Sequence, residues 1–117
     1  MTRVLVVDDH VSYRRLLTRL LRSGGYEVVG EAGTGRAAVE LVGSTTPDVV
    51  LLDVVLPDLD GFEVARRLAH SPAPPVVVFI SSRQRDDFGA FPDGLACWFL
   101  SKDEFTMDRL NGLLGED

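Results

Sequence analysis

Short, almost purely apolar runs constrain the fold of this chain most strongly. Four of them lie at residues 4–7 (VLVV), 49–52 (VVLL), 76–80 (VVVFI) and 98–101 (WFLS). Runs of this length without polar alternation are typical of strands that are buried on both faces, as in a parallel sheet. Stretches with helical periodicity separate them, and parallel strands need such crossovers. The pattern predicts the α/β fold class, with a doubly wound parallel sheet.

A fifth strand at 27–32 completes the expected five-stranded sheet, whose first and third strands we place at 3–7 and 49–52. Helices are expected at about 11–23, from Thr34 to about 43, at 61–70 and at 105–114. Thr34 is a good N-cap for the second of these helices, because its hydroxyl can accept a hydrogen bond from a free backbone N–H.

The segment between the last two strands, residues 82–94, departs from this regular alternation. Gly89 and Gly94 each weaken a helix by about 1 kcal/mol, and an interior Pro92 costs about 3 kcal/mol or more. We therefore expect the helix at this position to be shortened or irregular, with one or two turns that end before Pro92.

Size, charge and cysteine content limit the class of protein. The 117 residues suit a single domain spanning 1–117. A net charge of −6 argues against direct nucleic-acid contact by this chain. The lone Cys97 excludes an internal disulfide, fits a reducing compartment and is expected to pack as a small hydrophobe. Neither a secretory signal nor an apolar stretch of about 20 residues is visible, so we expect a cytoplasmic chain without a membrane partner.

Carboxylates follow two of the predicted strands, and a lysine follows a third. Asp8 and Asp9 come after 4–7, Asp53 comes after 49–52, and Lys102 comes after 98–101. Any one aspartate alone would be read as a helix cap or a solvated loop acid. Because the carboxyl ends of parallel strands converge, we expect these side chains to share one crevice. Clustered carboxylates favour a bound Mg²⁺, and a nearby lysine suits a phosphoryl oxygen.

The same residues form motifs of a known family. They are the acidic pair Asp8-Asp9, the spacing Asp53-x-x-x-Pro57-x-x-x-Gly61, and a hydroxyl residue and a lysine that end the last two strands, Ser81 and Lys102. In this order the motifs resemble the receiver (phosphoacceptor) domain of two-component response regulators over essentially the whole chain. The runs Asp-Asp-His at 8–10 and Lys-Asp at 102–103 resemble the NarL/FixJ-type subfamily. The resemblance implies a flavodoxin/CheY-like sheet with strand order 2-1-3-4-5.

The resemblance also implies roles in phosphoryl transfer. Asp53 would be the phosphoacceptor, taking a phosphoryl group from a sensor histidine kinase. Asp9, Asp53 and the main-chain carbonyl oxygen of Val55 would bind Mg²⁺ directly, while Asp8 would act largely through water. Such a domain is not an enzyme acting on an outside substrate, since its chemistry is limited to phosphorylation and autodephosphorylation of Asp53.

Further roles concern switching. Ser81 and Lys102 would bind the phosphoryl group, and Phe99 would move when Ser81 is drawn inward. Pro57 would shape the loop after the third strand, and Gly61 would let the next helix begin close to the site. The face formed by the segment after the fourth strand, the strand at 98–101 and the last helix would then change its affinity for a protein partner or an output domain.

Two competing functions and several local alternatives stay open at this stage. The irregular segment 82–94 would suit a pseudo-receiver that dimerises or docks without phosphate. An Mg²⁺-dependent phosphatase is disfavoured, because its aspartyl nucleophile normally follows the first strand in an Asp-x-Asp pair. A homodimer, and an output domain that regulates transcription outside this chain, are both left open. Ser82 could replace Ser81 as the phosphoryl-binding hydroxyl.

The remaining candidates are interpreted conservatively. His10 is taken as a loop residue beside the site, although an imidazole could also serve as a metal or phosphorelay group. Asp58 and Asp60 are interpreted as surface turn residues. Trp98 is expected to pack in the core, whereas the sequence does not decide the position of other aromatic residues in 88–91.

Overall fold

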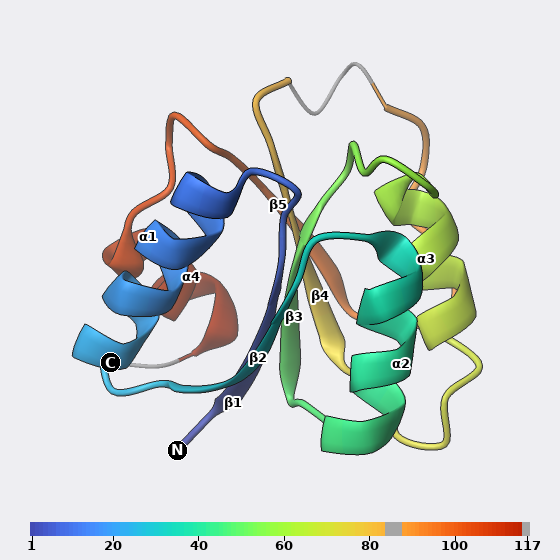
Figure 1. The fold of residues 1–117 in the computed structure, drawn as a ribbon, viewed down its shortest axis with the longest axis horizontal. Helices are drawn as coiled ribbons and strands as arrows, with labels where there is room; N and C mark the ends of the chain where they lie inside the picture. The colour runs from blue at the N-terminus through green and yellow to red at the C-terminus, as the bar shows by residue number, and fades with distance from the viewer. Residues whose placement is uncertain (84–87, 116–117) are drawn as a thin grey trace.

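A computed structural model describes residues 1–83 and 88–115 of the chain. Five parallel strands form one sheet in the order β2-β1-β3-β4-β5, which confirms the predicted doubly wound topology (Figure 1). The strands are β1 Arg3–Val7, β2 Glu27–Ala32, β3 Val49–Asp53, β4 Val76–Ser81 and β5 Cys97–Ser101. The helices are α1 Val11–Ser23, α2 Gly35–Thr45, α3 Gly61–Leu68 and α4 Met107–Leu114.

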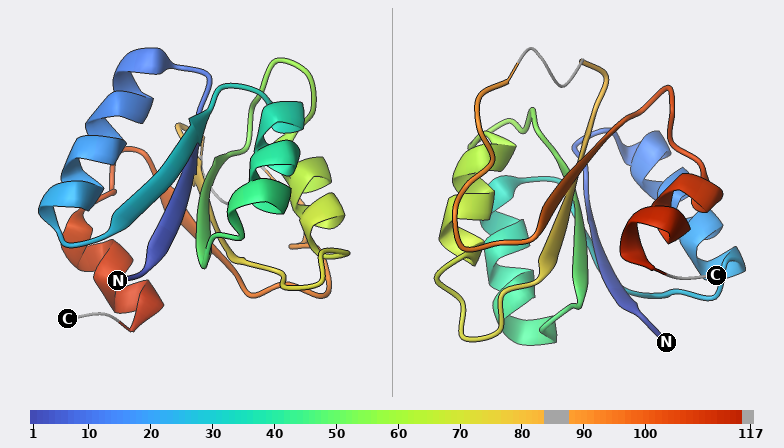
Figure 2. Two further views of the ribbon diagram at one scale, coloured as in Figure 1. Left: turned by 60° about the horizontal axis from the view of Figure 1, so that its bottom comes forward. Right: turned by 180° about the vertical axis from the view of Figure 1, so that it is seen from behind.

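Helices cover both faces of the sheet, as wholly apolar strands require. Helices α1 and α4 lie on one face, and α2 and α3 lie on the other (Figures 1 and 2). Alternate residues of β4 enter the two resulting cores: Val77 and Phe79 pack on the α2–α3 side, while Val78 and Ile80 pack on the α1–α4 side. The sheet therefore forms a rigid base for the loops at the carboxyl ends of its strands.

Element boundaries differ from the sequence prediction by one to two residues. Strands β3 and β4 each extend one residue further, so that Asp53 and Ser81 are their last residues. Helix α2 runs on to Thr45, and α3 ends at Leu68. Helix α4 begins two residues late because Thr106 caps it, accepting a hydrogen bond from a backbone N–H three residues on. The N-cap predicted for α2, on the other hand, is present as expected.

The segment between β4 and β5 is irregular where it is described, at 82–83 and 88–96. The one or two turns expected before Pro92 fall partly on 84–87, outside the described residues. Phe88 and Phe91 cover the α2–α3 side of the sheet. The ring centroid of Phe88 lies 5.6 Å from that of Phe62, and the centroid of Phe91 lies 5.6 Å from that of Phe79. These two side chains thus cover the part of the core that a regular helix between β4 and β5 would otherwise cover.

Strand β5 lies at the edge of the sheet, and its side chains alternate between the two faces. Cys97 and Phe99 pack against the α2–α3 core, as predicted for the cysteine. Trp98 points to the opposite face and is 44% exposed, so the expectation that it packs in the core is wrong. An edge strand has a neighbour on one side only, which leaves this large side chain without full cover.

None of the helices in the described residues combines the length and the apolar character that a membrane-spanning segment requires.

Candidate functional site

The carboxyl ends of four strands bring the predicted site residues to one edge of the sheet. Asp8 directly follows β1, and Asp53 ends β3. The two residues are only 1% and 4% exposed, respectively. Ser81 ends β4, one residue beyond the position that pairs with Asp53, and it is also buried. Lys102 follows β5, and its backbone N–H donates to the carbonyl oxygen of Ser81 at 2.7 Å.

Lys102 bridges the two buried carboxylates. Its Nζ lies 2.8 Å from Asp8 Oδ2 and 3.3 Å from Asp53 Oδ2. The shorter contact is an ion pair in which the ammonium covers the buried oxygen Asp8 Oδ2. The contact to Asp53 is a hydrogen bond as well as an ion pair. The ammonium therefore lies beside the oxygen atoms of the proposed nucleophile.

Burial changes the proton affinity of both partners. It raises the pKa of Asp53, and the charge of Asp8 adds to this effect, while the N–H of Val55 and the ammonium of Lys102 oppose it. Burial by itself would lower the pKa of Lys102, but its bonds and charge interactions with the two aspartates outweigh burial and raise that pKa. The lysine is thus held in its charged form.

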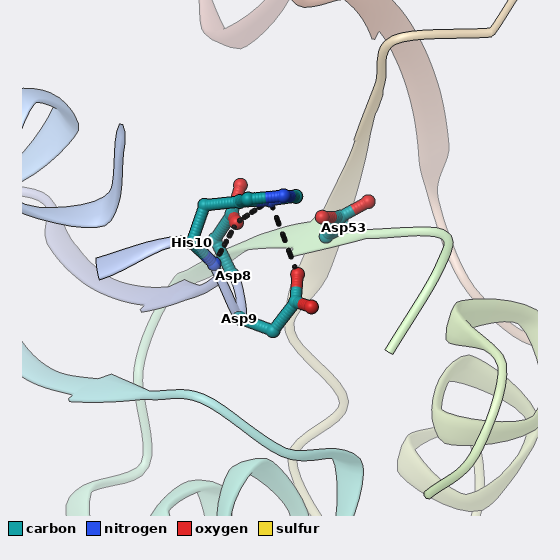
Figure 3. Close-up of side chains that lie close together, drawn as sticks. All are labelled: Asp8, Asp9, His10 and Asp53. Carbon is teal, nitrogen blue, oxygen red and sulfur yellow. Dashed lines mark hydrogen bonds and ion pairs between the residues drawn. The ribbon is translucent and has the colours of Figure 1, made fainter. Parts of the chain in front are cut away.

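The donor set suits a divalent cation. Ligand atoms of Asp8, Asp9, His10 and Asp53 all lie within 4.8 Å of one another (Figure 3). Three carboxylates against one ammonium leave an excess of two negative charges, which a divalent ion would balance. The residues therefore fit the Mg²⁺ that the sequence predicted.

The loop from β3 to α3 is shaped around Asp53. The N–H of Val55 donates to Asp53 Oδ1 at 3.1 Å, so this residue lies at the site, although its side chain is exposed. Pro57 lies exposed in the middle of the loop. At Gly61 a Cβ atom would lie 2.5 Å from the carbonyl oxygen of Asp53 and 2.8 Å from the Cα atom of Val54. Only glycine allows α3 to begin this close to the site.

The residues predicted to switch lie next to these groups. The Ser81 hydroxyl accepts a hydrogen bond from the N–H of Arg83 at 3.0 Å. Phe99 is half-buried on β5, and its ring centroid is 5.9 Å from that of Phe88. A movement of Phe99 would consequently disturb the aromatic packing of the irregular segment.

Sequence reasoning missed the structural role of Asp58. Its carboxylate accepts hydrogen bonds from the N–H groups of Gly35 at 2.8 Å and Arg36 at 3.0 Å, and so binds the N-terminus of α2 to the loop after β3. These bonds lower the pKa of Asp58, the bond from Gly35 most of all. Asp60, also interpreted as a turn residue, is the N-cap of α3, because its carboxylate accepts a hydrogen bond from the backbone N–H of Glu63. An acidic residue three positions before a glutamate is a recognised capping pattern that could have revealed it.

Two further side chains contact the site from α1 and the turn before it. The ammonium of Lys102 lies 4.5 Å from the ring centroid of Tyr13, and burial, with the nearby carboxylates, raises the pKa of that tyrosine to about 12. His10 was expected to be a loop residue beside the site, and its Nδ1 atom lies 3.3 Å from Asp8 Oδ1 and 3.3 Å from Asp9 Oδ1. Spacing alone did not indicate these contacts.

The fold and the site define a receiver domain of the two-component response regulators. The response regulator receiver domain family matches residues 4–113, and the chain belongs to that family. Members of this family are phosphorylated by histidine kinases, bind Mg²⁺ at an acidic pocket and are often joined to output domains.

Two relatives and one solved structure illustrate the match. The transcriptional regulatory protein PdtaR of Mycobacterium tuberculosis is 44% identical over 100 residues, covering 86% of this chain and 49% of that protein. A transcriptional regulatory protein of the same organism named NarL is 38% identical over 115 residues, covering 96% of this chain and 53% of that protein. The solved signal receiver domain of NarL from this organism has a TM-score of 0.78 at 35% identity, with 98% of each chain covered.

These relatives support the NarL-type assignment made from the sequence. The chain spans about half the length of the two transcriptional regulators that it matches. What the remaining half of those proteins does is therefore not transferred to this chain.

Proposed function

We propose that residues 1–117 act as one receiver domain, a cytoplasmic signalling module switched by phosphorylation of Asp53. The observation that carries this proposal is the position of Lys102, whose ammonium lies 3.3 Å from Asp53 Oδ2 and 2.8 Å from Asp8 Oδ2. Two carboxylates buried side by side need a neutralising charge, which this ammonium supplies. Beside the nucleophile, the same ammonium can stabilise the oxygens of a transferred phosphoryl group.

In the proposed reaction, a carboxylate oxygen of Asp53 attacks the phosphorus atom of a phosphohistidine on a sensor histidine kinase. A P–O bond forms, the P–N bond breaks, and the imidazole leaves with its electron pair. Lys102 balances charge on the phosphoryl oxygens, and the Ser81 hydroxyl donates to one of them. Phosphoryl transfer depends mainly on such positioning and charge balance.

Mg²⁺, when bound, supplies neutralising charge to the oxygens around the phosphorus atom. Asp9, Asp53 and the carbonyl oxygen of Val55 would hold it directly, and Asp8 would hold it through water. The support from this chain is the shared position of the carboxylates. Pro57 and Gly61 keep the Val55 backbone in place.

The output of the switch would be a change at β5 and the elements beside it. When Ser81 turns to the phosphoryl group, Phe99 moves with it and alters the surface of β5. The exposed Trp98 on this edge strand offers apolar area to a protein partner or an output domain. A second copy of the chain is an alternative partner. The chain itself makes no nucleic-acid contact and transforms no outside substrate.

Intact mass measurement tests the proposal. The chain is incubated with Mg²⁺ and acetyl phosphate beside an Asp53→Asn variant and an Asp108→Asn variant, which loses an exposed carboxylate on α4. We expect one phosphoryl adduct on the native chain and on Asp108→Asn, and none on Asp53→Asn. An adduct that persists in Asp53→Asn, or its absence from the native chain, would contradict the proposal.

One observation favours the pseudo-receiver as a second candidate. Residues 88–96 carry no helix, and Phe88 packs at 5.9 Å from Phe99, the residue that would have to move. If these rings hold β5 in one conformation, the domain acts by docking alone. A native chain that binds Mg²⁺ but forms no adduct would make this the better account.

A further inference from the structure

His10 lies where it can bind the same ion as the carboxylates. We propose that its Nδ1 atom is a nitrogen ligand of the metal site, and that it gives the site a preference for first-row transition metal ions over Mg²⁺. The inference deepens the proposed function and rests on it in one respect, because it takes the cluster of Asp8, Asp9 and Asp53 to be a divalent metal site.

The distances match those between ligands of a single ion. His10 Nδ1 lies 3.3 Å from Asp8 Oδ1 and 3.3 Å from Asp9 Oδ1. An octahedral ion with bonds of about 2.1 Å keeps neighbouring ligand atoms about 3.0 Å apart and opposite ones about 4.2 Å apart. The whole set of four ligand atoms, with Asp53 included, falls within 4.8 Å. Small side-chain adjustments would therefore place His10 Nδ1, Asp9 and Asp53 around one ion, with Asp8 close enough to hold it through water.

The ring of His10 makes a local contact that a bound ion would replace, because its Nδ1 atom lies at hydrogen-bond distance, 3.3 Å, from Asp8 Oδ1. His10 is the N-cap residue of α1, yet its side chain makes no capping hydrogen bond. Instead, its backbone N–H donates to Asp8 Oδ1 at 2.8 Å, which fixes the turn and holds the ring beside the carboxylates (Figure 3). The side chain is 69% exposed, so the ring can turn toward an ion without breaking packing contacts.

The type of ligand decides which ions gain from this arrangement. Mg²⁺ prefers oxygen ligands only, whereas imidazole suits ions such as Ni²⁺ and Zn²⁺. A site in which one imidazole joins the carboxylates should consequently favour the transition metals more than an all-oxygen site does. If His10 instead acted as a cation paired with Asp8 and Asp9, a metal ion would compete with it. Removing the ring would then strengthen binding of every divalent ion.

Affinity measurements separate these cases. Dissociation constants for Mg²⁺ and Ni²⁺ are measured at one pH on the untagged chain, on His10→Ala and on His70→Ala. His70 is the other histidine of the chain, exposed beyond the end of α3, and serves as the matched control. We expect His10→Ala to weaken Ni²⁺ binding by at least about tenfold, to change Mg²⁺ binding by less than about threefold, and His70→Ala to change neither. Equal changes for both ions, or tighter Ni²⁺ binding, would overturn the proposal.

Nitrogen NMR of the imidazole rings tests the ligand directly. Diamagnetic Zn²⁺ is added to the ¹⁵N-histidine-labelled chain, and we expect the Nδ1 resonance of His10 to shift while both resonances of His70 stay in place. Zn²⁺ binding that leaves the His10 resonance unmoved would also overturn the proposal. If either the affinity or the NMR result contradicts the role of His10, the proposed function still holds as long as the native chain binds Mg²⁺ and forms the Asp53 adduct. A native chain that binds neither Mg²⁺ nor Ni²⁺ would overturn both.

Discussion

The ammonium of Lys102 lies over the ring of Tyr13, with Nζ 4.5 Å from the ring centroid. The same ammonium contacts Asp8 and Asp53, so an aromatic face and two carboxylates together fix its position. The lysine side chain is only 15% exposed, and a cation attracted to a ring gains more when water is largely excluded. Tyr13 is therefore a positioning residue for the proposed phosphoryl-binding lysine.

Replacing Tyr13 tests this relationship. Tyr13→Leu removes the aromatic face, worth about 1 kcal/mol, and should slow adduct formation from acetyl phosphate by about fivefold. Tyr13→Phe keeps the ring and serves as the control, with a rate close to that of the native chain. The rates are measured by intact mass at fixed times. Equal rates for the two variants would show that the ring does not position the lysine.

The beginning of α3 gives a second prediction. Gly61→Ala places a methyl group against the backbone of Asp53 and Val54, at 2.5 and 2.8 Å, and backbone atoms cannot move aside as a flexible side chain can. We expect a loss of about 2 kcal/mol in the free energy of unfolding, with slower adduct formation, because the nucleophile shifts. Urea denaturation measures the stability.

Gly43→Ala is the matched control for that variant. Gly43 lies within α2, and nothing stands within 4 Å of the position of its Cβ atom. Alanine should therefore stabilise the helix by about 0.5–1 kcal/mol. A Gly61→Ala variant that is as stable as the native chain would mean that α3 can begin further from Asp53 than the structure shows.

A third prediction concerns pH. The pKa of Asp53 is raised from its usual value near 3.8, chiefly by burial, so its charged form is less favourable in the folded chain than in the unfolded chain. The stability associated with this group is thus complete below about pH 3.8 and is lost as the pH rises through the raised pKa. Asp53→Asn should accordingly have a higher Tm than the native chain at pH 7 without divalent ions.

The Tm difference should shrink as the pH falls through the raised pKa and vanish below about 3.8, because the carboxyl is then neutral in both states. Asp108→Asn, which loses an exposed carboxylate, should show no such trend. Adding Mg²⁺ at pH 7 should reverse the order, since the ion stabilises the native chain more than Asp53→Asn. Differential scanning calorimetry at several pH values measures these shifts. A native chain that is more stable than Asp53→Asn at pH 7 without ions would contradict the raised pKa.

The parts of this structure that the sequence predicted depend on local patterns. Apolar runs without alternation located the buried strands, and the residue after each run is carried to one edge of a parallel sheet; Asp8, Asp53 and Lys102 follow from that rule alone. The carboxylate of Asp58 could not be placed in the same way. It bonds to Gly35, 23 residues earlier in the chain, and such a contact exists only after the loop and α2 have packed together.

The directions in which side chains point could not be predicted from the sequence either. The sequence did not show that Trp98 lies on the poorly covered side of an edge strand, because both strand order and helix positions decide which side is covered. It also did not show that the ring of His10 lies over the carboxylates, since the ring direction follows from the turn fixed by Asp8 Oδ1. Contacts of this kind depend on three-dimensional packing.

Neighbouring residues on β5 give a final prediction. Trp98 is 44% exposed, whereas Phe99 packs against the α2–α3 core beside Phe88. Trp98→Ala should change the free energy of unfolding by no more than about 0.5 kcal/mol, as is usual for surface positions. Phe99→Ala removes a packed ring and should cost on the order of 2–3 kcal/mol, somewhat less than a fully buried phenylalanine.

Far-UV circular dichroism during urea denaturation measures both variants, because Trp98 is the only tryptophan and its removal leaves fluorescence unsuitable. Similar losses in the two variants would mean that Trp98 is covered and that β5 does not lie open at the edge of the sheet. The expected difference would leave Trp98 free for a partner, since a side chain that adds little to stability can change its environment on binding without unfolding the domain.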